Sequence, residues 1–322
     1  MYTDVKTILD DASRNNYGVL AASAINLELA RGLIAAADEL QSPLIILMGQ
    51  MQMTKHARAD VMVPLIRTLA EETNVPVALI LDHGRDWEVI THAYRNGFSS
   101  IMIDASAYEL EENIRRTKKV IEMCHPQGVA VEAELGHVGQ AALGEQTDDS
   151  CYTRPEDVTE FLNQTRADCL AIACGTAHGQ YPKGVTPEIR FDIIRAVKKV
   201  TDVPIALHGG SGSGDENIKK AVEAGINKVN VCTEIFNYVR DEIRKTLEQT
   251  PEIDLLSLMS RTEQAAKEIG KHFICLTGSQ GKAANFQRKS AFQYGFAQTE
   301  TDEGRIGGRI NKSSPKEKTK IS

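Results

Sequence analysis

The chain has 322 residues, of which 42% are hydrophobic, and it carries 37 Lys and Arg residues against 44 Asp and Glu residues. This apolar content is enough for a sizeable core and excludes wholesale disorder. The net charge of −7 argues against a nucleic-acid binder, which needs a positive surface. No apolar run approaches the roughly 18 residues of a membrane span, and the first residues, MYTDVKTILDD, contain no signal-peptide core.

The cysteines are scattered and include no CxxC pair; they lie at positions 124, 151, 169, 174, 232 and 275. Three of them fall in apolar stretches, which is typical of reduced thiols rather than of a disulfide framework. We therefore expect a cytoplasmic protein that does not associate with membranes.

Short apolar runs alternate with amphipathic segments along most of the chain. The runs cover residues 19–24, 44–47, 77–81, 100–103, 129–133, 170–173, 205–207 and 228–231. Runs of this length, mostly rich in Val, Ile or Leu, are typical of parallel strands that are buried on both faces. Helical periodicity marks the segments between them, among others 27–40, 61–72, 110–124 and 155–164.

Eight strands that each precede a helix predict a (β/α)8 TIM barrel of the α/β class. The rival fold, a doubly wound open sheet, would carry GxGxxG after its first strand. The chain reads Ala24-Ile25-Asn26-Leu27 there, which favours the barrel.

The end of the chain differs in composition from the rest. Apolar periodicity fails from about Asn285 onward, and Arg305, Arg309 and four lysines follow in a Gly-, Ser- and Pro-containing segment. We expect a single barrel domain over residues 1–284 and a flexible basic tail over 285–322, to which we assign no function.

Polar residues gather at the carboxyl ends of the predicted strands, where a barrel enzyme builds its active site. His83, His178 and His208 all fall at these ends, although the chain has only eight histidines. Three imidazoles at one rim form a tripodal nitrogen site of the kind that zinc favours when it keeps a position open for substrate. With Asp82 beside His83, this pattern predicts metal binding.

Two carboxylates follow neighbouring strands at the same rim. Asp104 and Glu134 could hold a second divalent or monovalent cation or support the ligands of the first. Ordinary ion pairing at a polar rim explains them equally well, so the residues alone leave both readings open.

Glycine-rich loops at the same rim indicate an anion site. The segment 209–212 reads GGSG, which lets backbone amides approach a ligand, with Ser211 as a further donor. In barrels, the loops after strands seven and eight commonly bind phosphate. Residues 231–233 (VCT) supply the second of these loops, and Gly179 and Lys183 could complete the site.

A zinc ion beside a phosphate pocket predicts a phosphorylated carbonyl substrate. The metal would polarise the carbonyl and stabilise an ene-diolate. Asp82 is placed to move a proton on a substrate hydroxyl or carbonyl. The expected chemistry is carbon–carbon cleavage or enolisation of a sugar phosphate.

These segments resemble the class II, zinc-dependent fructose/tagatose-bisphosphate (ketose-bisphosphate) aldolases. The resemblance runs from the N-terminus to GSQGKA at 278–283. Its six ordered motifs are LDHG at 81–84, SIMIDAS at 100–106, VEAELG at 131–136, CGTAHGQY at 174–181, LHGGSG at 207–212 and KVNVCTE at 228–234.

The resemblance implies a set of roles for residues of this chain. Asp82 would be the proton donor and acceptor, and His83, His178 and His208 would bind the catalytic zinc. Asp104 and Glu134 match the carboxylates of a second metal. The remaining matches would bind the substrate; they are Gly179, Gly209, Gly210, Ser211, Asn230, Val231, Cys232 and Thr233. We add Asn26 and Lys183 as substrate-binding candidates because of their positions after predicted strands.

The implied reaction is the reversible cleavage of a ketose 1,6-bisphosphate to dihydroxyacetone phosphate and an aldehyde such as glyceraldehyde 3-phosphate. The resemblance also implies a homodimer or homotetramer, with a small phosphorylated sugar as the ligand.

The chain departs from the family pattern around the substrate. Cys232 takes a position often held by Asp, and residues 48–50 replace a serine-containing segment. The loop 139–149 lacks the usual GGxED, so that Glu145 is the best candidate for its mobile base, and Lys183 is shifted by one proline. These changes leave the metal site intact and concern the aldehyde half of the substrate.

Other functions fit parts of this pattern. An aldolase for another phosphorylated ketose would explain the loop changes. A non-catalytic, metal-binding partner subunit would be favoured by the loss of Asp82 or of a histidine, but all four residues are present. A barrel hydrolase that uses zinc-bound water would have no evident use for the phosphate-type loops.

Overall fold

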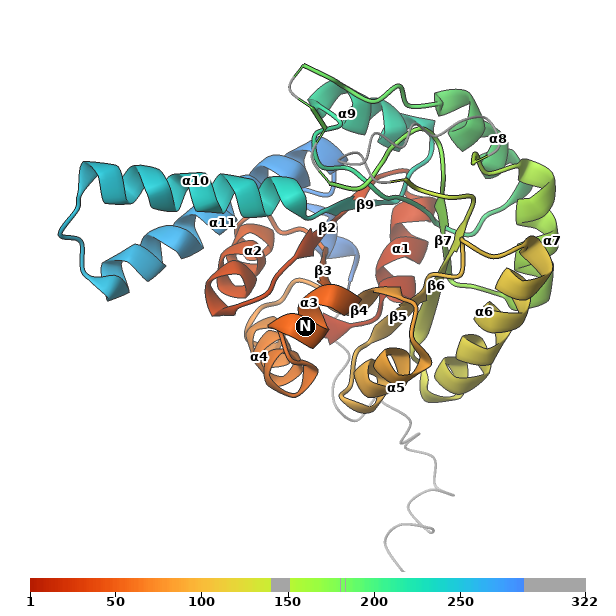
Figure 1. Cartoon of the computed structure of the whole chain (residues 1–322), viewed down its shortest axis with the longest axis horizontal. Helices are drawn as coiled ribbons and strands as arrows, with labels where there is room; N and C mark the ends of the chain where they lie inside the picture. The colour runs from red at the N-terminus through yellow and green to blue at the C-terminus, as the bar shows by residue number, and fades with distance from the viewer. Residues whose placement is uncertain (140–150, 180, 183, 287–322) are drawn as a thin grey trace, which may run out of the picture. The chain divides into compact units, whose positions relative to one another are not determined.

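A closed barrel of parallel strands forms the centre of the computed structural model, which describes residues 1–139, 151–179, 181–182 and 184–286. Its strands are β2 (Val19–Ser23), β3 (Leu44–Gly49), β4 (Val77–Gly84), β5 (Ser100–Ile103), β6 (Ala130–Leu135), β7 (Cys169–Ile172), β8 (Ile205–Leu207) and β9 (Lys228–Val231). Each pairs in parallel with its neighbour in the chain, and β9 pairs with β2 to close the ring. The predicted (β/α)8 barrel is confirmed (Figure 1).

Helices follow the strands in turn and surround the barrel (Figure 1). They are α2 (Leu27–Glu39), α4 (Ala59–Glu72), α5 (Trp87–Arg95), α6 (Leu110–Cys124), α7 (Pro155–Thr165), α8 (Phe191–Val200), α9 (Asp215–Ala224) and α10 (Thr233–Gln249). Further helical segments are α1 (Val5–Arg14), α3 (Gln50–Lys55), α11 (Leu255–Thr277) and 3₁₀ turns at His125–Gln127 and Lys282–Asn285. No helix in the described ranges is long and apolar enough to cross a membrane.

The strands are apolar on both faces because each face meets a separate core. On β4, Leu79 and Leu81 point outward and pack in the layer between strands and helices. Ala78 and Ile80 alternate with them and fill the barrel interior. This double burial explains why the strands read as continuous apolar runs in the sequence.

The start of the chain closes the amino end of the barrel, a feature that was not predicted from the sequence. The short strand β1 (Tyr2–Thr3) pairs with the first residues of β4. Helix α1 then places Val5, Ile8 and Leu9 in the cluster that fills the barrel interior. The apolar residues of α1 recur at helical spacing, so one face of this helix fills the amino end of the barrel. The opposite, carboxyl end is left free to hold a site.

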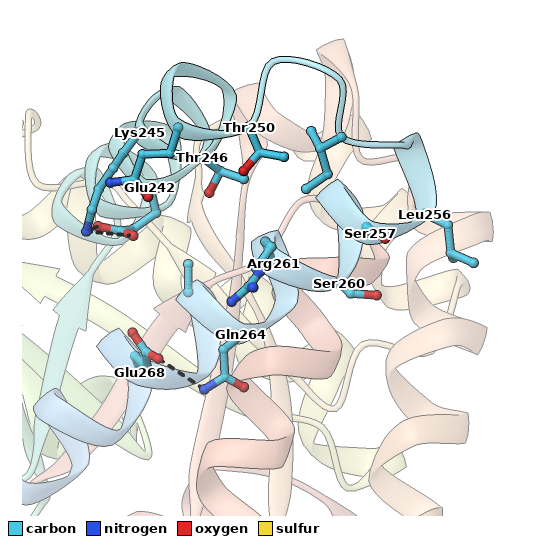
Figure 2. Close-up of a pocket in the computed structure, with 13 residues that line it drawn as sticks. Glu242, Lys245, Thr246, Thr250, Leu256, Ser257, Ser260, Arg261, Gln264 and Glu268 are labelled. Carbon is cyan, nitrogen blue, oxygen red and sulfur yellow. Dashed lines mark hydrogen bonds and ion pairs between the residues drawn. The ribbon is translucent and has the colours of Figure 1, made fainter.

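Helices α10 and α11 form an antiparallel pair that extends beyond the barrel (Figure 1). Near the barrel, α11 packs so closely on α2 that a Cβ atom on Gly32 would lie 2.4 Å from the carbonyl oxygen of Glu263. Figure 2 shows a polar surface pocket of about 750 Å³ between α10 and α11, lined by side chains such as Lys245 and Arg261. This pocket lies away from the strand ends.

Leu9→Ala tests the role of α1 as the closure of the barrel. Leu9 is fully buried, so the substitution leaves a cavity and should lower the free energy of unfolding by about 2–5 kcal/mol. The exposed Lys6 of the same helix provides the control, and Lys6→Ala should change the stability by about 0.5 kcal/mol or less. Chemical denaturation measures both; equal effects would contradict this role.

Candidate functional site

A β-bulge at the end of β4 turns two successive side chains toward the mouth of the barrel. Between β4 and β5 the register advances from Leu81 to Gly84 on one strand but only from Ile101 to Ile103 on the other. Residues next to each other on a regular strand face opposite sides. The extra residue, together with a φ of +50° at His83, lets Asp82 and His83 both face the site.

The three histidines singled out in the sequence come together at this mouth. His83 ends β4, His178 lies in the loop after β7, and His208 directly follows β8. The ring of His83 lies 4.6 Å from that of His178 and 4.8 Å from that of His208, measured between centroids. The rings of His178 and His208 are 5.7 Å apart. Strands that are distant in sequence thus converge on one cluster.

Carboxylates surround the histidine cluster. Asp104 accepts a hydrogen bond from His83 Nδ1 at 2.9 Å and pairs with Arg85 at 2.8 Å. Burial raises the pKa of Asp104, but the contacts with His83, Ser106 and Arg85 bring it well below its usual range. Burial lowers the pKa of His83, whereas the carboxylates of Asp82, Asp104 and Glu134 raise it to about 9. The site therefore attracts positive charge.

The donor atoms of the cluster fit a bound cation. His83, Glu134, His178 and His208 each offer a ligand atom, and these atoms lie within 4.8 Å of one another. Glu134 Oε2 is buried and lacks a hydrogen-bond partner within the described residues. Burial and the two neighbouring imidazoles lower the pKa of His178 to about 2, so its ring is neutral as a metal ligand requires. Nitrogen and carboxylate donors of this kind suit a transition metal.

A buried carboxylate, that of Glu132, lies behind His208. No role for it was predicted from the sequence. Glu132 Oε1 is 3.0 Å from His208 Nε2, and it also contacts Lys228 Nζ at 2.9 Å. Glu132 and Lys228 are interior residues of β6 and β9. Glu132 stands two residues before Glu134, and this spacing is the signal that both carboxylates face the barrel interior.

Asp82 is held in place by a side chain from another strand of the barrel. Asn230, on β9, donates from Nδ2 to Asp82 Oδ1 at 3.1 Å. Asn230 Oδ1 is buried and has no hydrogen-bond partner among the residues described. The side-chain oxygen of Asn230 is thus available to a ligand. It lies beside the carboxylate of Asp82, whose second oxygen does not bind Asn230.

The predicted phosphate-type loops are joined to each other. Ser211 Oγ accepts hydrogen bonds from the amides of Cys232 and Glu234, each at 3.2 Å. Gly209 has a φ of +68°, and a Cβ atom there would lie 2.5 Å from the carbonyl oxygen of Ala177. Only glycine fits this position. The loop therefore lies against the N-terminus of α10, where amides and the helix dipole favour an anion.

A pocket of about 430 Å³ connects these loops with the histidine cluster. Its lining includes Gly49, Gln50, Gln52, Asp82, His83, Arg85, His178, Gly179, Gly209, Ser211, Asn230, Cys232 and Thr233. Four of these, Gly49, Gln50, Gln52 and Arg85, were not predicted as binding residues. Arg85 is exposed and follows the motif that contains His83, and this position could have pointed to it.

Gln52 connects the segment after β3 to the phosphate-type loops. Its Nε2 atom donates to Cys232 Sγ at 3.3 Å. Burial raises the pKa of the Cys232 thiol, so a neutral side chain occupies this part of the pocket.

Some predicted site residues do not line the pocket with their side chains. Asn26 Oδ1 accepts from the amide of Leu29 at 3.0 Å and thereby caps α2. Val231 packs in the outer apolar layer, so only its backbone can serve a ligand. Gly210 lies behind the loop, where a Cβ atom would meet the carbonyl oxygen of Asn230 at 2.7 Å. Glu145 and Lys183 lie outside the described residues.

Known proteins share this chain's sequence and fold. Residues 3–282 match the model of the family described as fructose-bisphosphate aldolase class-II. The chain is 36% identical over 284 residues to the uncharacterized protein YdjI of Escherichia coli K12, a match that covers 88% of this chain and 100% of that protein. The crystal structure of the YdjI aldolase aligns with a TM-score of 0.76 at 34% identity, and the alignment covers 88% and 100% of the two chains.

Two further relatives have names that state an activity. The chain is 35% identical over 302 residues to a fructose-bisphosphate aldolase of Thermus caldophilus, covering 86% of this chain and 98% of the relative. It is also 35% identical over 288 residues to a sulfofructosephosphate aldolase of Alkalicoccus urumqiensis, covering 88% and 99%. The chain therefore belongs to the class II fructose-bisphosphate aldolase family of aldehyde-lyases.

Proposed function

We propose that the protein is a zinc-dependent aldolase that reversibly cleaves a ketose 1,6-bisphosphate of the fructose or tagatose type. The products are dihydroxyacetone phosphate and an aldehyde such as glyceraldehyde 3-phosphate. One observation carries the proposal: three imidazoles and a buried carboxylate converge beside Asp82, in a pocket that also reaches an amide-rich, phosphate-type loop. We further propose a homodimer or homotetramer that works in the cytoplasm.

His83, His178 and His208 would hold the zinc ion, and Glu134 lies with them in the same cluster. When bound, zinc acts as a Lewis acid that polarises the ketose carbonyl and stabilises the ene-diolate. Asp104 bonds to His83 and Arg85, which suits a supporting role; with Glu134 it could also hold a second divalent or monovalent cation.

Asp82 would move the proton that cleavage requires. In the cleavage direction, its carboxylate takes the proton of the substrate hydroxyl next to the bond that breaks. The oxygen becomes the aldehyde carbonyl, and the electron pair of the broken carbon–carbon bond passes to the ene-diolate of dihydroxyacetone phosphate. The hydrogen bond from Asn230 orients Asp82 for this transfer. Glu145 would return a proton to the carbon of the ene-diolate.

The phosphate of dihydroxyacetone phosphate would bind at the loops after β7, β8 and β9. Gly209 and Ser211 line the pocket beside the N-terminus of α10, and Cys232 and Thr233 begin that helix. The backbones of Gly210 and Val231 adjoin these residues in the chain, and Gly179 also lines the pocket. Lys183 is assigned to the same anion and Asn26 to the substrate.

A second candidate substrate is a ketose phosphate with a different terminal group. The 35% identity to a sulfofructosephosphate aldolase favours it, because that name denotes a sulfonated sugar. Arg85 supplies a guanidinium to the pocket, and its side chain is 60% exposed. A guanidinium binds phosphate and sulfonate oxygens in the same way, so this residue is compatible with either substrate.

Asp82→Asn should retain zinc and lose most of its turnover, because the amide cannot accept the proton. We expect a decrease in kcat of roughly 10²- to 10⁴-fold. The measurement pairs the rate of triose phosphate formation with the zinc content of each preparation. Asp60→Asn, at an exposed residue of α4, is the matched control and should retain full activity. Unchanged activity of Asp82→Asn would remove this carboxylate from the mechanism.

His208→Ala should lower the zinc content of the purified protein, because a site that loses one of its imidazoles binds the metal less tightly. Elemental analysis of metal per chain gives the result. His272→Ala removes a histidine that pairs with Asp215 at the surface, and this control should leave the zinc content unchanged. Full zinc content in His208→Ala would contradict the assignment of His208 as a ligand.

A further inference from the structure

An ion pair lies completely buried inside the barrel. Lys228 Nζ is 2.9 Å from Glu132 Oε1 and 2.8 Å from Oε2, so it contacts both carboxylate oxygens. Neither side chain is exposed to solvent. Lys228 lies on β9 and Glu132 on β6, and only the barrel interior brings these strands face to face.

The barrel interior also holds a buried apolar cluster. It contains Ala21, Leu47, Ile80 and Met102, together with the apolar face of α1. Two charges moved from water into such surroundings lose their hydration, and their mutual attraction does not reliably repay that loss. An apolar pair of similar volume would fill the same space at no such cost. The ion pair is therefore poorly explained as a stabilising contact.

His208 is the third member of this buried group. Its Nε2 atom is 3.0 Å from Glu132 Oε1, and its ring is fully buried. A carboxylate accepts hydrogen bonds and does not donate them, so the ring proton lies on Nε2. The other nitrogen, Nδ1, faces the cluster, 3.1 Å from His83 Nε2 and 3.4 Å from Glu134 Oε2.

The same arrangement of ring, carboxylate and cation occurs at a second histidine of the cluster. His83 Nδ1 contacts Asp104, and Asp104 in turn pairs with Arg85. His83 Nε2 is thereby left to face His208. The two imidazoles thus direct their inner nitrogens toward the same point. The other nitrogen of each ring contacts a carboxylate, which is in turn paired with a cationic side chain. Outer carboxylates of this kind fix the orientation and tautomer of metal-binding histidines.

We propose that Glu132 and Lys228 are positioning residues that hold His208 with Nε2 protonated and Nδ1 directed at the metal. Glu132 accepts the ring proton, and Lys228 holds both oxygens of Glu132 in place. The inference rests on the metal site of the proposed function, and it adds two residues that touch neither substrate nor metal. Metal affinity, rather than stability, is the property that this pair supports.

Two charge-free variants separate positioning from packing. Both E132L/K228M and E132Q/K228M lack the ion pair, but only the second keeps an oxygen that can accept from His208 Nε2. We expect the zinc dissociation constant of E132L/K228M to rise roughly 10- to 100-fold, and that of E132Q/K228M to rise less. Competition with a chromogenic chelator measures it, and thermal unfolding of the zinc-free proteins reports stability separately.

Asp215→Asn is the control for the loss of a histidine–carboxylate contact elsewhere. Asp215 contacts His272 Nε2 at 3.2 Å on the surface of the protein, and its substitution should leave zinc affinity unchanged. Equal zinc affinities of wild type and folded E132L/K228M would overturn the proposal. A reduced melting temperature with unchanged zinc affinity would likewise assign the pair a structural role only.

Nitrogen-15 NMR of the histidine rings of the wild-type protein tests the proposal without a variant. We expect His208 Nε2 to carry a proton both with and without zinc. An unprotonated Nε2 in either form would overturn the proposal, even if the variants fail to fold. This result is independent of aldol cleavage, so a failure of the proposed reaction and a failure of the positioning role give different outcomes.

Discussion

The convergence of strand ends in a closed parallel barrel is the constraint on which the site depends. Closure places residues that are more than 100 positions apart, such as His83 and His208, within hydrogen-bonding distance. Side-chain alternation then decides which residues face inward, so Glu132 and Glu134 on β6 both enter the interior. Because α1 fills the amino end, the site opens at the carboxyl end. The fold thereby concentrates charge at one mouth.

Assembling the cluster costs free energy because its charged groups lose water on burial. The surrounding carboxylates nevertheless make it a site that favours a cation. Burial alone would disfavour a charge on His83, yet three neighbouring carboxylates raise its pKa to about 9. Glu134 has a buried oxygen that finds no hydrogen-bond partner within the described part of the chain. A bound metal ion would balance the negative charge of these carboxylates and would supply a partner for the buried oxygen of Glu134. The interaction that shapes the site is therefore the attraction between a ring of buried acids and whatever cation the imidazoles hold.

The sequence could predict the parts of the structure that follow from periodicity and position. Apolar runs marked the strands, and the histidines, Asp82 and the GGSG segment stood directly after them. It could not predict the bulge at His83, because a positive φ at a non-glycine residue arises from pairing with β5. The contact of Glu132 with Lys228 and His208 also depends on three-dimensional closure. Arg85 reaches the pocket from the loop after β4, and Gln52 reaches it from the short helix α3; local sequence does not determine where either segment runs.

Aldol cleavage by the same preparation before and after removal of its metal tests the central claim most directly. Fructose 1,6-bisphosphate and tagatose 1,6-bisphosphate serve as substrates, with triose phosphate as the measured product. We expect cleavage of at least one sugar, loss of cleavage after chelation, and its return when zinc is added. Cleavage that persists after the metal has demonstrably been removed, or no cleavage of either sugar by zinc-loaded protein, would contradict a zinc-dependent ketose-bisphosphate aldolase.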